Sequence, residues 1–353
     1  MKSIINYIEN VGNSDFLEEE FNEIDNLVLS DITYLDFDNI VNNKLTLYEV
    51  GKIFFNKYND KDIKKEVFAV REAYEIFKSC YDKKRYKDIL VYNYVYTSSN
   101  DTQFSALTFK LTKDLIYVGY EGTDSLISGW KEDFYMSYIF PVKAHEYAID
   151  YLNNTIKLFD KNVIVGGHSK GGNLALVASM YANFFVRRKI KAIYNNDGPG
   201  LRKEELDTKY YKRVRDRYIH IVPNYSYVGI LLRHDKFRVI KSNKKNILSH
   251  AISTWEIKDR KLVDEELSRL SKNLKDGIIS WLDNHNYDER RKMLEPIFNI
   301  IEESKIYTLD DLKKSKNILT LIKNLNSIDG ETKKIALDFF KYNVSYLVEN
   351  IRD

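Results

Sequence analysis

The sequence predicts an α/β protein with a mostly parallel central sheet and helical segments at both ends. One observation is an apolar strand, a tight turn and an alanine- and leucine-rich helix that follow one another in residues 163–178. The other is a change near residue 89, where helical periodicity gives way to runs dense in β-branched and aromatic residues. Strands that alternate with helices in this way favour parallel pairing.

The elements follow one another in a simple order. Apolar residues recur three and four positions apart in residues 1–85, which predicts a mainly helical portion. Three strands joined by hairpins are expected next, then a helix from Pro141 to about Phe159, then parallel strands. The predicted strands are 89–97, 104–111, 115–120, the strand before Ser169, 190–196, 217–223 and 237–241.

A soft boundary is expected near residues 257–262, because the chain beyond Asp259 looks helical with heavily charged faces. We therefore predict one domain in residues 1–257, which includes the N-terminal helical portion, and a C-terminal helical segment in residues 258–353.

The composition indicates a globular chain and argues against a nucleic-acid-binding, a disulfide-stabilised or an integral membrane protein. Of 353 residues, 44% are hydrophobic and 30% are charged. The net charge is only +3, so there is no electrostatic case for a nucleic-acid partner. Cys80 is the single cysteine, so no internal disulfide is possible. No signal-peptide pattern and no apolar run of bilayer length is found, and we expect a cytoplasmic protein without an integral membrane segment.

The turn in residues 163–178 carries the strongest functional signal. Gly167, Ser169 and Gly171 form the G-x-S-x-G pattern of a nucleophile elbow, in which the serine sits on a sharp strand-to-helix turn. Side chains at the two glycines would collide with the neighbouring strand or helix. The first amides of the following helix, beginning with Lys170, would face an oxyanion. A phosphate-binding turn is the alternative, but such loops use a different glycine spacing.

A serine nucleophile needs a histidine base, and three histidines follow Ser169 within the sheet region. His250 follows the last candidate strand, where the base belongs, and it is the preferred candidate. His220 is expected in mid-strand, pointing into the packing of the sheet, and His234 in a solvated polar turn.

Asp197 is the preferred acid because it ends the strand that follows the elbow helix, at the carboxyl edge of the sheet. Its other interpretation is an aspartate that bonds its own turn before Gly198. The slot after Pro223 holds no carboxylate, and Asp235 is expected to be exposed.

A second oxyanion donor is expected from the Gly122–Thr123 loop, through its backbone amides and the Thr123 hydroxyl, beside the Lys170 amide. A capping threonine is the alternative. His168 is expected to pack or to orient rather than to act as the base. No spacing suggests a metal site and no dinucleotide fingerprint is present, so no cofactor is expected.

Together these motifs resemble the Mbeg1-like (DUF2974) family of bacterial α/β-hydrolases, which is distantly similar to the class 3 lipases. The resemblance covers about residues 1–257 and rests on these segments: 22–29, 122–124, 129–134, 167–173, 197–200, 228–232 and 250–255. It implies an α/β-hydrolase fold, Ser169 as nucleophile, His250 as base and Thr123 in the oxyanion hole.

Two positions depart from the lipase pattern. Asn224, Tyr225 and Ser226 stand where the lipases place the acid, and Ala251 follows His250 where an aspartate is common. Either Asp197 supplies the acid or the triad is weakened.

The expected function is a serine hydrolase acting through an acyl-enzyme on a small-molecule or lipid-like carboxylic ester. The alternative is a non-catalytic α/β-hydrolase scaffold that binds a partner or a hydrophobic ligand. A membrane-surface role for the charged helical ends is the weaker alternative, because such faces are usually solvated.

Overall fold

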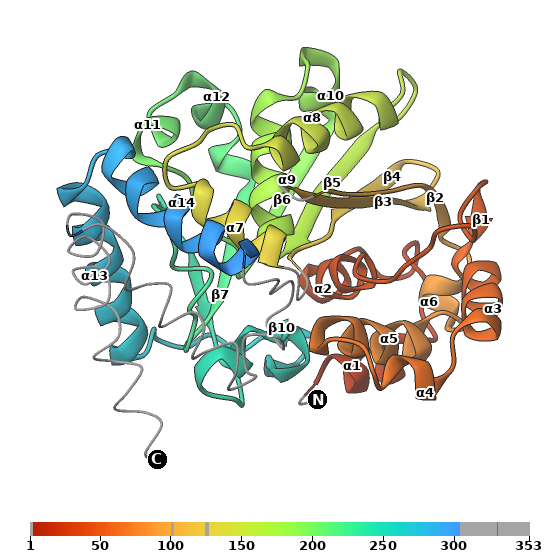
Figure 1. Ribbon diagram of the computed structural model, residues 1–353. Helices are drawn as coiled ribbons and strands as arrows, with labels where there is room; N and C mark the ends of the chain where they lie inside the picture. The colour runs from red at the N-terminus through yellow and green to blue at the C-terminus, as the bar shows by residue number, and fades with distance from the viewer. Residues whose placement is uncertain (1–2, 100–101, 124–126, 304–329, 331–353) are drawn as a thin grey trace.

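A central sheet of eight strands organises the molecule, and the strands lie side by side in the order in which they occur in the sequence (Figure 1). The computed structural model describes residues 3–99, 102–123, 127–303 and 330. The strands are β1 (Leu45–Thr46), β2 (Leu90–Ser98), β3 (Gln103–Thr112), β4 (Leu115–Tyr120), β5 (Asn162–His168), β6 (Ile190–Asn196), β7 (Tyr218–Pro223) and β8 (Arg238–Ile240).

The pairing changes direction once along the sheet. Neighbours from β1 to β4 are antiparallel, whereas neighbours from β4 to β8 are parallel. This arrangement confirms the predicted α/β-hydrolase fold, with hairpins that open a mostly parallel sheet. Because β4 to β8 run in one direction, their carboxyl ends share one edge, which is where ligands bind in sheets of this kind.

Helices cover both faces of the sheet. The N-terminal helices are α1 (Ile4–Val11), α2 (Glu23–Ile32), α3 (Leu47–Lys57), α4 (Asp60–Ile63), α5 (Phe68–Cys80) and α6 (Lys84–Lys87). Later helices are α7 (Ile127–Tyr135), α8 (Lys143–Thr155), α9 (Lys170–Tyr181), α10 (Phe184–Lys189), α11 (Lys203–Leu206), α12 (Lys209–Lys212), α13 (Arg269–Asn284) and α14 (Tyr287–Glu303).

Strand alternation separates the two main cores. Tyr117 on β4 packs with the N-terminal helices, whereas its neighbours Ile116 and Val118 pack with α8 and α9. Successive residues of a strand face opposite sides, so both faces of these buried strands must be apolar. The N-terminal helices and α8–α10 therefore lie on opposite sides of the sheet (Figure 1).

One predicted helix is longer than the helix in the structure, and a hairpin lies at the predicted domain boundary. The helix expected from Pro141 to Phe159 is α8, which is shorter because Ile156 already has extended backbone angles. At the predicted domain boundary, β9 (Ile257–Lys258) and β10 (Lys261–Leu262) form a hairpin before the helices resume. The division at residue 257 stays a prediction, and nearly all of residues 304–353 lie outside the described residues.

The C-terminal helices pack back onto the hydrolase portion. Met136 after α7, Trp281 of α13 and Phe298 of α14 belong to one apolar cluster. In the part of the chain that the structure describes, no helix has both the length and the apolar composition needed to cross a membrane.

Candidate active site

Ser169 stands between β5 and α9 with strained backbone angles. Its φ is 56° and its ψ is −134°, a conformation that residues with side chains seldom adopt. The turn is held by the Ser169 amide, which donates to the Asn196 carbonyl at 2.9 Å, and by the Ser169 carbonyl, which accepts from Gly172. This is the geometry of a nucleophile elbow.

The two glycines of the motif are required by close contacts. A Cβ at Gly167 would lie 2.3 Å from the Gly171 backbone carbon, and a Cβ at Gly171 would lie 2.1 Å from the Tyr120 carbonyl oxygen. Backbone atoms cannot yield as a flexible side chain can. The strand and the helix that flank Ser169 therefore approach each other as closely as they do only with glycine at both positions.

His250 and Asp197 meet at the carboxyl edge of the sheet. The distance from His250 Nδ1 to Asp197 Oδ2 is 2.6 Å. Asp197 directly follows β6, and His250 ends a short 3-10 helix at Asn246–His250. An imidazole that donates from Nδ1 to a carboxylate presents its other nitrogen, Nε2, as a base.

Asp197 is fully buried and accepts two further hydrogen bonds. The Ser226 hydroxyl donates to Oδ1 at 2.5 Å and the Gly229 amide donates to the same oxygen at 3.1 Å. Burial raises the pKa of Asp197, and the bonds from His250, Ser226 and Gly229 oppose that rise. Ser226 thus occupies the slot where the lipases place their acid, and it supports Asp197 instead.

His168 holds the His250 loop against the elbow. Its Nε2 donates to the His250 carbonyl at 2.9 Å, and its Nδ1 lies 3.3 Å from the Tyr34 hydroxyl. The two imidazole rings lie 4.4 Å apart, and burial, followed by the nearby His250, holds the pKa of His168 well below its usual value. A neutral ring that donates to one neighbour and accepts from another acts as an orienting group.

Ser169 and His250 lie at the same edge without a direct bond. In residues 3–99, 102–123 and 127–303, no hydrogen bond joins the Ser169 hydroxyl to the His250 ring. Bonds between nucleophile and base are often long in unliganded enzymes and shorten when substrate binds. The other histidines lie elsewhere: His220 is buried on β7, and the half-buried His234 stacks on it rather than lying in a solvated turn.

Thr123 follows the glycine that contacts the Ser169 turn, and its side chain has a partner that the sequence pattern did not indicate. Its hydroxyl donates to Asp133 Oδ2 at 2.8 Å, while Asp133 Oδ1 is buried without a hydrogen bond. A Cβ at Gly122 would lie 2.9 Å from Ser169 Cβ, so the loop before Thr123 touches the elbow. Burial raises the pKa of Asp133 to about 7. Asp133 falls in the segment 129–134 that carried the family resemblance, but its spacing from Thr123 has no recognised pattern.

The Lys170 side chain is structural, whereas its backbone amide begins α9. The ammonium group donates to Glu132 Oε2 at 3.0 Å and to the Gln103 carbonyl at 2.8 Å. Glu132 also accepts from the Thr102 hydroxyl and the Ala144 amide. This buried network joins β3, α7, α8 and α9 behind the candidate oxyanion hole.

Glu132→Ala is expected to lower the free energy of unfolding by about 3–5 kcal/mol, because it removes the hydrogen-bonded counter-ion of the buried Lys170 ammonium group. The two side chains are only 1% and 3% exposed. The matched control is Glu146→Ala, which removes the exposed partner of Lys143 and should cost less than about 1 kcal/mol. Urea unfolding compares the two variants, and equal losses would contradict the structural role of the buried pair.

A cavity of about 770 Å³ lies between the N-terminal helical portion and strand β2. Tyr34, Phe54, Tyr58 and Tyr94 supply aromatic walls, and Glu121 lines it directly before the Gly122–Thr123 loop. The Tyr34 hydroxyl that faces His168 is also 2.0 Å from the position a Gly122 Cβ would take. Tyr34 and Glu121 therefore link the cavity wall to the loop that contacts the elbow, although neither Ser169 nor His250 lines the cavity.

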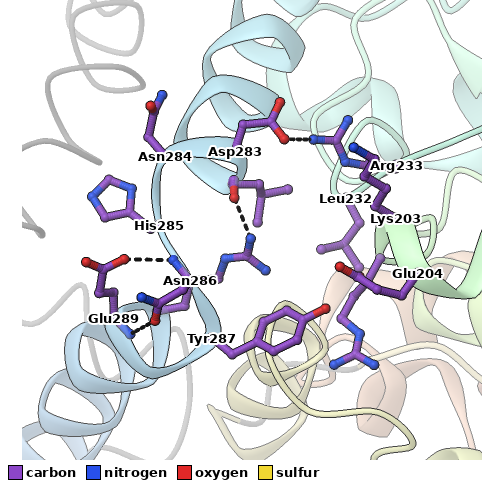
Figure 2. A pocket seen from close by; sticks show the side chains of 13 residues that line it. Lys203, Glu204, Leu232, Arg233, Asp283, Asn284, His285, Asn286, Tyr287 and Glu289 are labelled. Carbon is purple, nitrogen blue, oxygen red and sulfur yellow. Dashed lines mark hydrogen bonds and ion pairs between the residues drawn. The ribbon is translucent and has the colours of Figure 1, made fainter.

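Figure 2 shows a second cavity, of about 490 Å³, where α13 and α14 meet the loop around Arg233. Two of its arginines bond an acidic side chain or the backbone: Arg233 pairs with Asp283, and Arg290 donates to the Ser137 and Leu282 carbonyls. Neither Ser169 nor His250 lines it. These contacts fasten the C-terminal helices rather than form a reaction site. Within the described residues, no group of histidine, cysteine and acidic side chains is arranged to hold a metal ion.

The Mbeg1-like family model matches residues 80–299. No curated protein matches the chain. Among solved structures, the chain is similar to one titled "Crystal structure of M37 lipase", with 16% sequence identity, a TM-score of 0.37, and coverage of 60% of this chain and 70% of that chain. Because the family match spans more than half of the chain, the protein belongs to the Mbeg1-like family.

Proposed function

We propose that the protein is a serine hydrolase that cleaves a carboxylic ester through an acyl-enzyme. One observation carries the proposal: Ser169 occupies a strained elbow at the sheet edge where His250 and the buried Asp197 lie 2.6 Å apart. A strained serine next to an imidazole held by a buried carboxylate is the arrangement that nucleophilic acyl transfer requires.

In the proposed reaction, the Ser169 hydroxyl gives its proton to His250 Nε2 as its oxygen bonds to the ester carbonyl carbon. Asp197 keeps the proton on Nδ1 and stabilises the imidazolium that forms. The Lys170 amide and the Thr123 loop stabilise the oxyanion. The protonated His250 then donates to the departing alcohol, and the carbon–oxygen bond of the ester breaks. Water, activated by the same histidine, releases the acid and regenerates Ser169.

The cavity lined by Tyr34 and Glu121 is the proposed site for one of the two substituents of the ester. Its walls are mainly aromatic and aliphatic, which suits an apolar or lipid-like group. Five acidic residues, Asp36, Asp62 and Glu66 among them, and one lysine also line it, and this excess of negative charge disfavours a negatively charged substituent.

A fluorophosphonate probe tests the proposal, because it labels serines that an adjacent base has activated. The wild-type protein is expected to be labelled, and Ser169→Ala is expected not to be labelled. Ser179→Ala is a matched control, since Ser179 is a buried serine on the same helix whose hydroxyl donates to the Ala175 carbonyl. A folded wild-type protein that stays unlabelled would favour the non-catalytic scaffold. An ester panel of varied acyl length, run beside Ser169→Ala, then defines the substrate.

A further inference from the structure

Four large apolar side chains project into solvent from two connecting segments, here called turns: one joins α8 to β5, and the other joins α9 to β6 and contains the short helix α10. Leu158 and Phe159, in the turn between α8 and β5, are 72% and 89% exposed. Phe184 and Phe185, on α10, are 53% and 68% exposed. Single exposed apolar residues are common on soluble proteins, but four together form a patch that needs an explanation.

The two turns lie side by side at the amino edge of the sheet. They lead into β5 and β6, which are parallel neighbours with Val163 opposite Ile190. Lys189 ties the turns together by donating to the carbonyls of Lys157 and Leu158, at 2.5 and 2.9 Å. We call Leu158, Phe159, Phe184 and Phe185 the amino-edge patch. In Figure 1, α10 lies on the far side of the sheet from the N-terminal helices.

The amino-edge patch is surrounded by positive charge. Residues 157–161 and 183–191 contain six basic residues and one acidic residue, and Asp114 pairs with Lys161, which leaves an excess of four positive charges, whereas the whole chain carries a net charge of +3. The basic residues are Lys157, Lys161, Arg187, Arg188, Lys189 and Lys191. Lys157, Arg188 and Lys191 are exposed, and the Arg188 guanidinium lies over the Phe184 ring at 5.3 Å.

We propose that the amino-edge patch docks the protein on an anionic membrane surface. The four apolar side chains would enter the boundary between lipid headgroups and acyl chains, and the basic residues around them would meet the lipid phosphates. The apolar side chains stand on protruding turns rather than in a groove, so they can enter a soft interface. The local excess of positive charge favours a membrane that contains anionic lipids. Apolar insertion and electrostatic attraction together supply the two contributions that stable peripheral binding requires.

The position of the amino-edge patch fixes how the docked protein would be oriented. The patch precedes β5, and Ser169 directly follows this strand of seven residues. A strand of that length separates the two ends by roughly 20 Å. Docking would therefore leave the candidate active site facing away from the bilayer. The inference does not depend on the proposed hydrolase activity, because it concerns another surface and is measured by binding alone.

Vesicle co-sedimentation of the full chain tests the proposal. The wild-type protein is expected to bind vesicles that contain phosphatidylglycerol, to bind pure phosphatidylcholine vesicles at least about tenfold more weakly, and to be released by salt. Phe184→Ser with Phe185→Ser is expected to lower binding at least about tenfold. The matched control is Tyr48→Ser with Phe68→Ser, which removes aromatic rings that are 41% and 49% exposed on α3 and α5, and it should bind as the wild type does.

A second pair of variants separates the charge from the apolar contribution. Arg188→Gln with Lys191→Gln should weaken binding to the anionic vesicles and reduce its dependence on salt. Leu158→Ser with Phe159→Ser removes the exposed apolar side chains of the other turn and should also lower vesicle binding. This variant tests the proposal if the α10 variant fails to fold.

Failure of the wild-type protein to bind anionic vesicles, or unchanged binding by both apolar variants, would overturn the proposal. Analytical ultracentrifugation gives another contrary outcome. If the amino-edge patch variants abolish self-association while the wild type ignores vesicles, the patch is a protein interface and the membrane proposal is wrong.

Discussion

Asp197→Asn is expected to lower kcat for ester hydrolysis by about 10⁴-fold while the protein stays folded. The asparagine Oδ1 can still accept from Ser226 and Gly229, which leaves its amide group facing His250 Nδ1 in place of the carboxylate oxygen. An amide donor there forces Nδ1 to accept, and the ring proton moves to Nε2, where it blocks removal of the Ser169 proton.

The control for this prediction is Asp235→Asn, which changes the exposed aspartate that is the other acid candidate near the sheet. Its carboxylate accepts a long hydrogen bond from the Tyr211 hydroxyl, at 3.4 Å, and kcat should stay within about twofold of the wild-type value. Steady-state kinetics on one activated ester, with circular dichroism to verify folding, compares the variants. A normal kcat for Asp197→Asn would show that Asp197 is not the acid of the triad. Its carboxylate would then serve only to hydrogen-bond the turn.

Local signals made the elbow predictable from the sequence. Gly167, Ser169 and Gly171 lie within five residues, between an apolar strand and an apolar helix. All three positions are determined by the same sharp turn of the backbone. The order of strands was also predictable from the sequence. Hairpin residues, and the apolar repeats that distinguish strands from helices, are properties of short segments. Both therefore appear in the sequence before any tertiary contact is considered.

Contacts between distant segments were less predictable. His250 and Asp197 are 53 residues apart, and the Tyr34 hydroxyl reaches His168 across 134 residues. Strand ends read from the sequence made both residues candidates, but their contact depends on how several strands and loops pack, which no local pattern encodes. The lipase pattern placed the acid after Pro223, yet in the structure the hydroxyl of Ser226, from that same loop, donates to Asp197. Asp133 was not singled out, because one carboxylate in a charged helix looks like a solvated residue until the fold buries it.

Asp133 is expected to make the oxyanion hole sensitive to pH. The Thr123 hydroxyl has one proton, and in the structure it donates that proton to Asp133 Oδ2. An ionised Asp133 therefore holds the proton away from the oxyanion. Burial raises the pKa of Asp133 to about 7, so the neutral form is present below that pH and is lost as the pH rises through it. A neutral Asp133 can donate to Thr123 Oγ1 and release the threonine proton to the oxyanion.

Asp133→Asn is therefore expected to fix the favourable arrangement, because its amide group donates to Thr123 Oγ1 at every pH. The ratio of kcat for Asp133→Asn to kcat for the wild type should rise as the pH increases above about 7, and groups that titrate alike in both proteins cancel from that ratio. Thr123→Val removes the hydroxyl and should lower kcat by about 10²–10³-fold if the hydroxyl is an oxyanion donor. A ratio that stays constant from acid to alkaline pH, together with a nearly normal Thr123→Val, would assign oxyanion stabilisation to backbone amides alone.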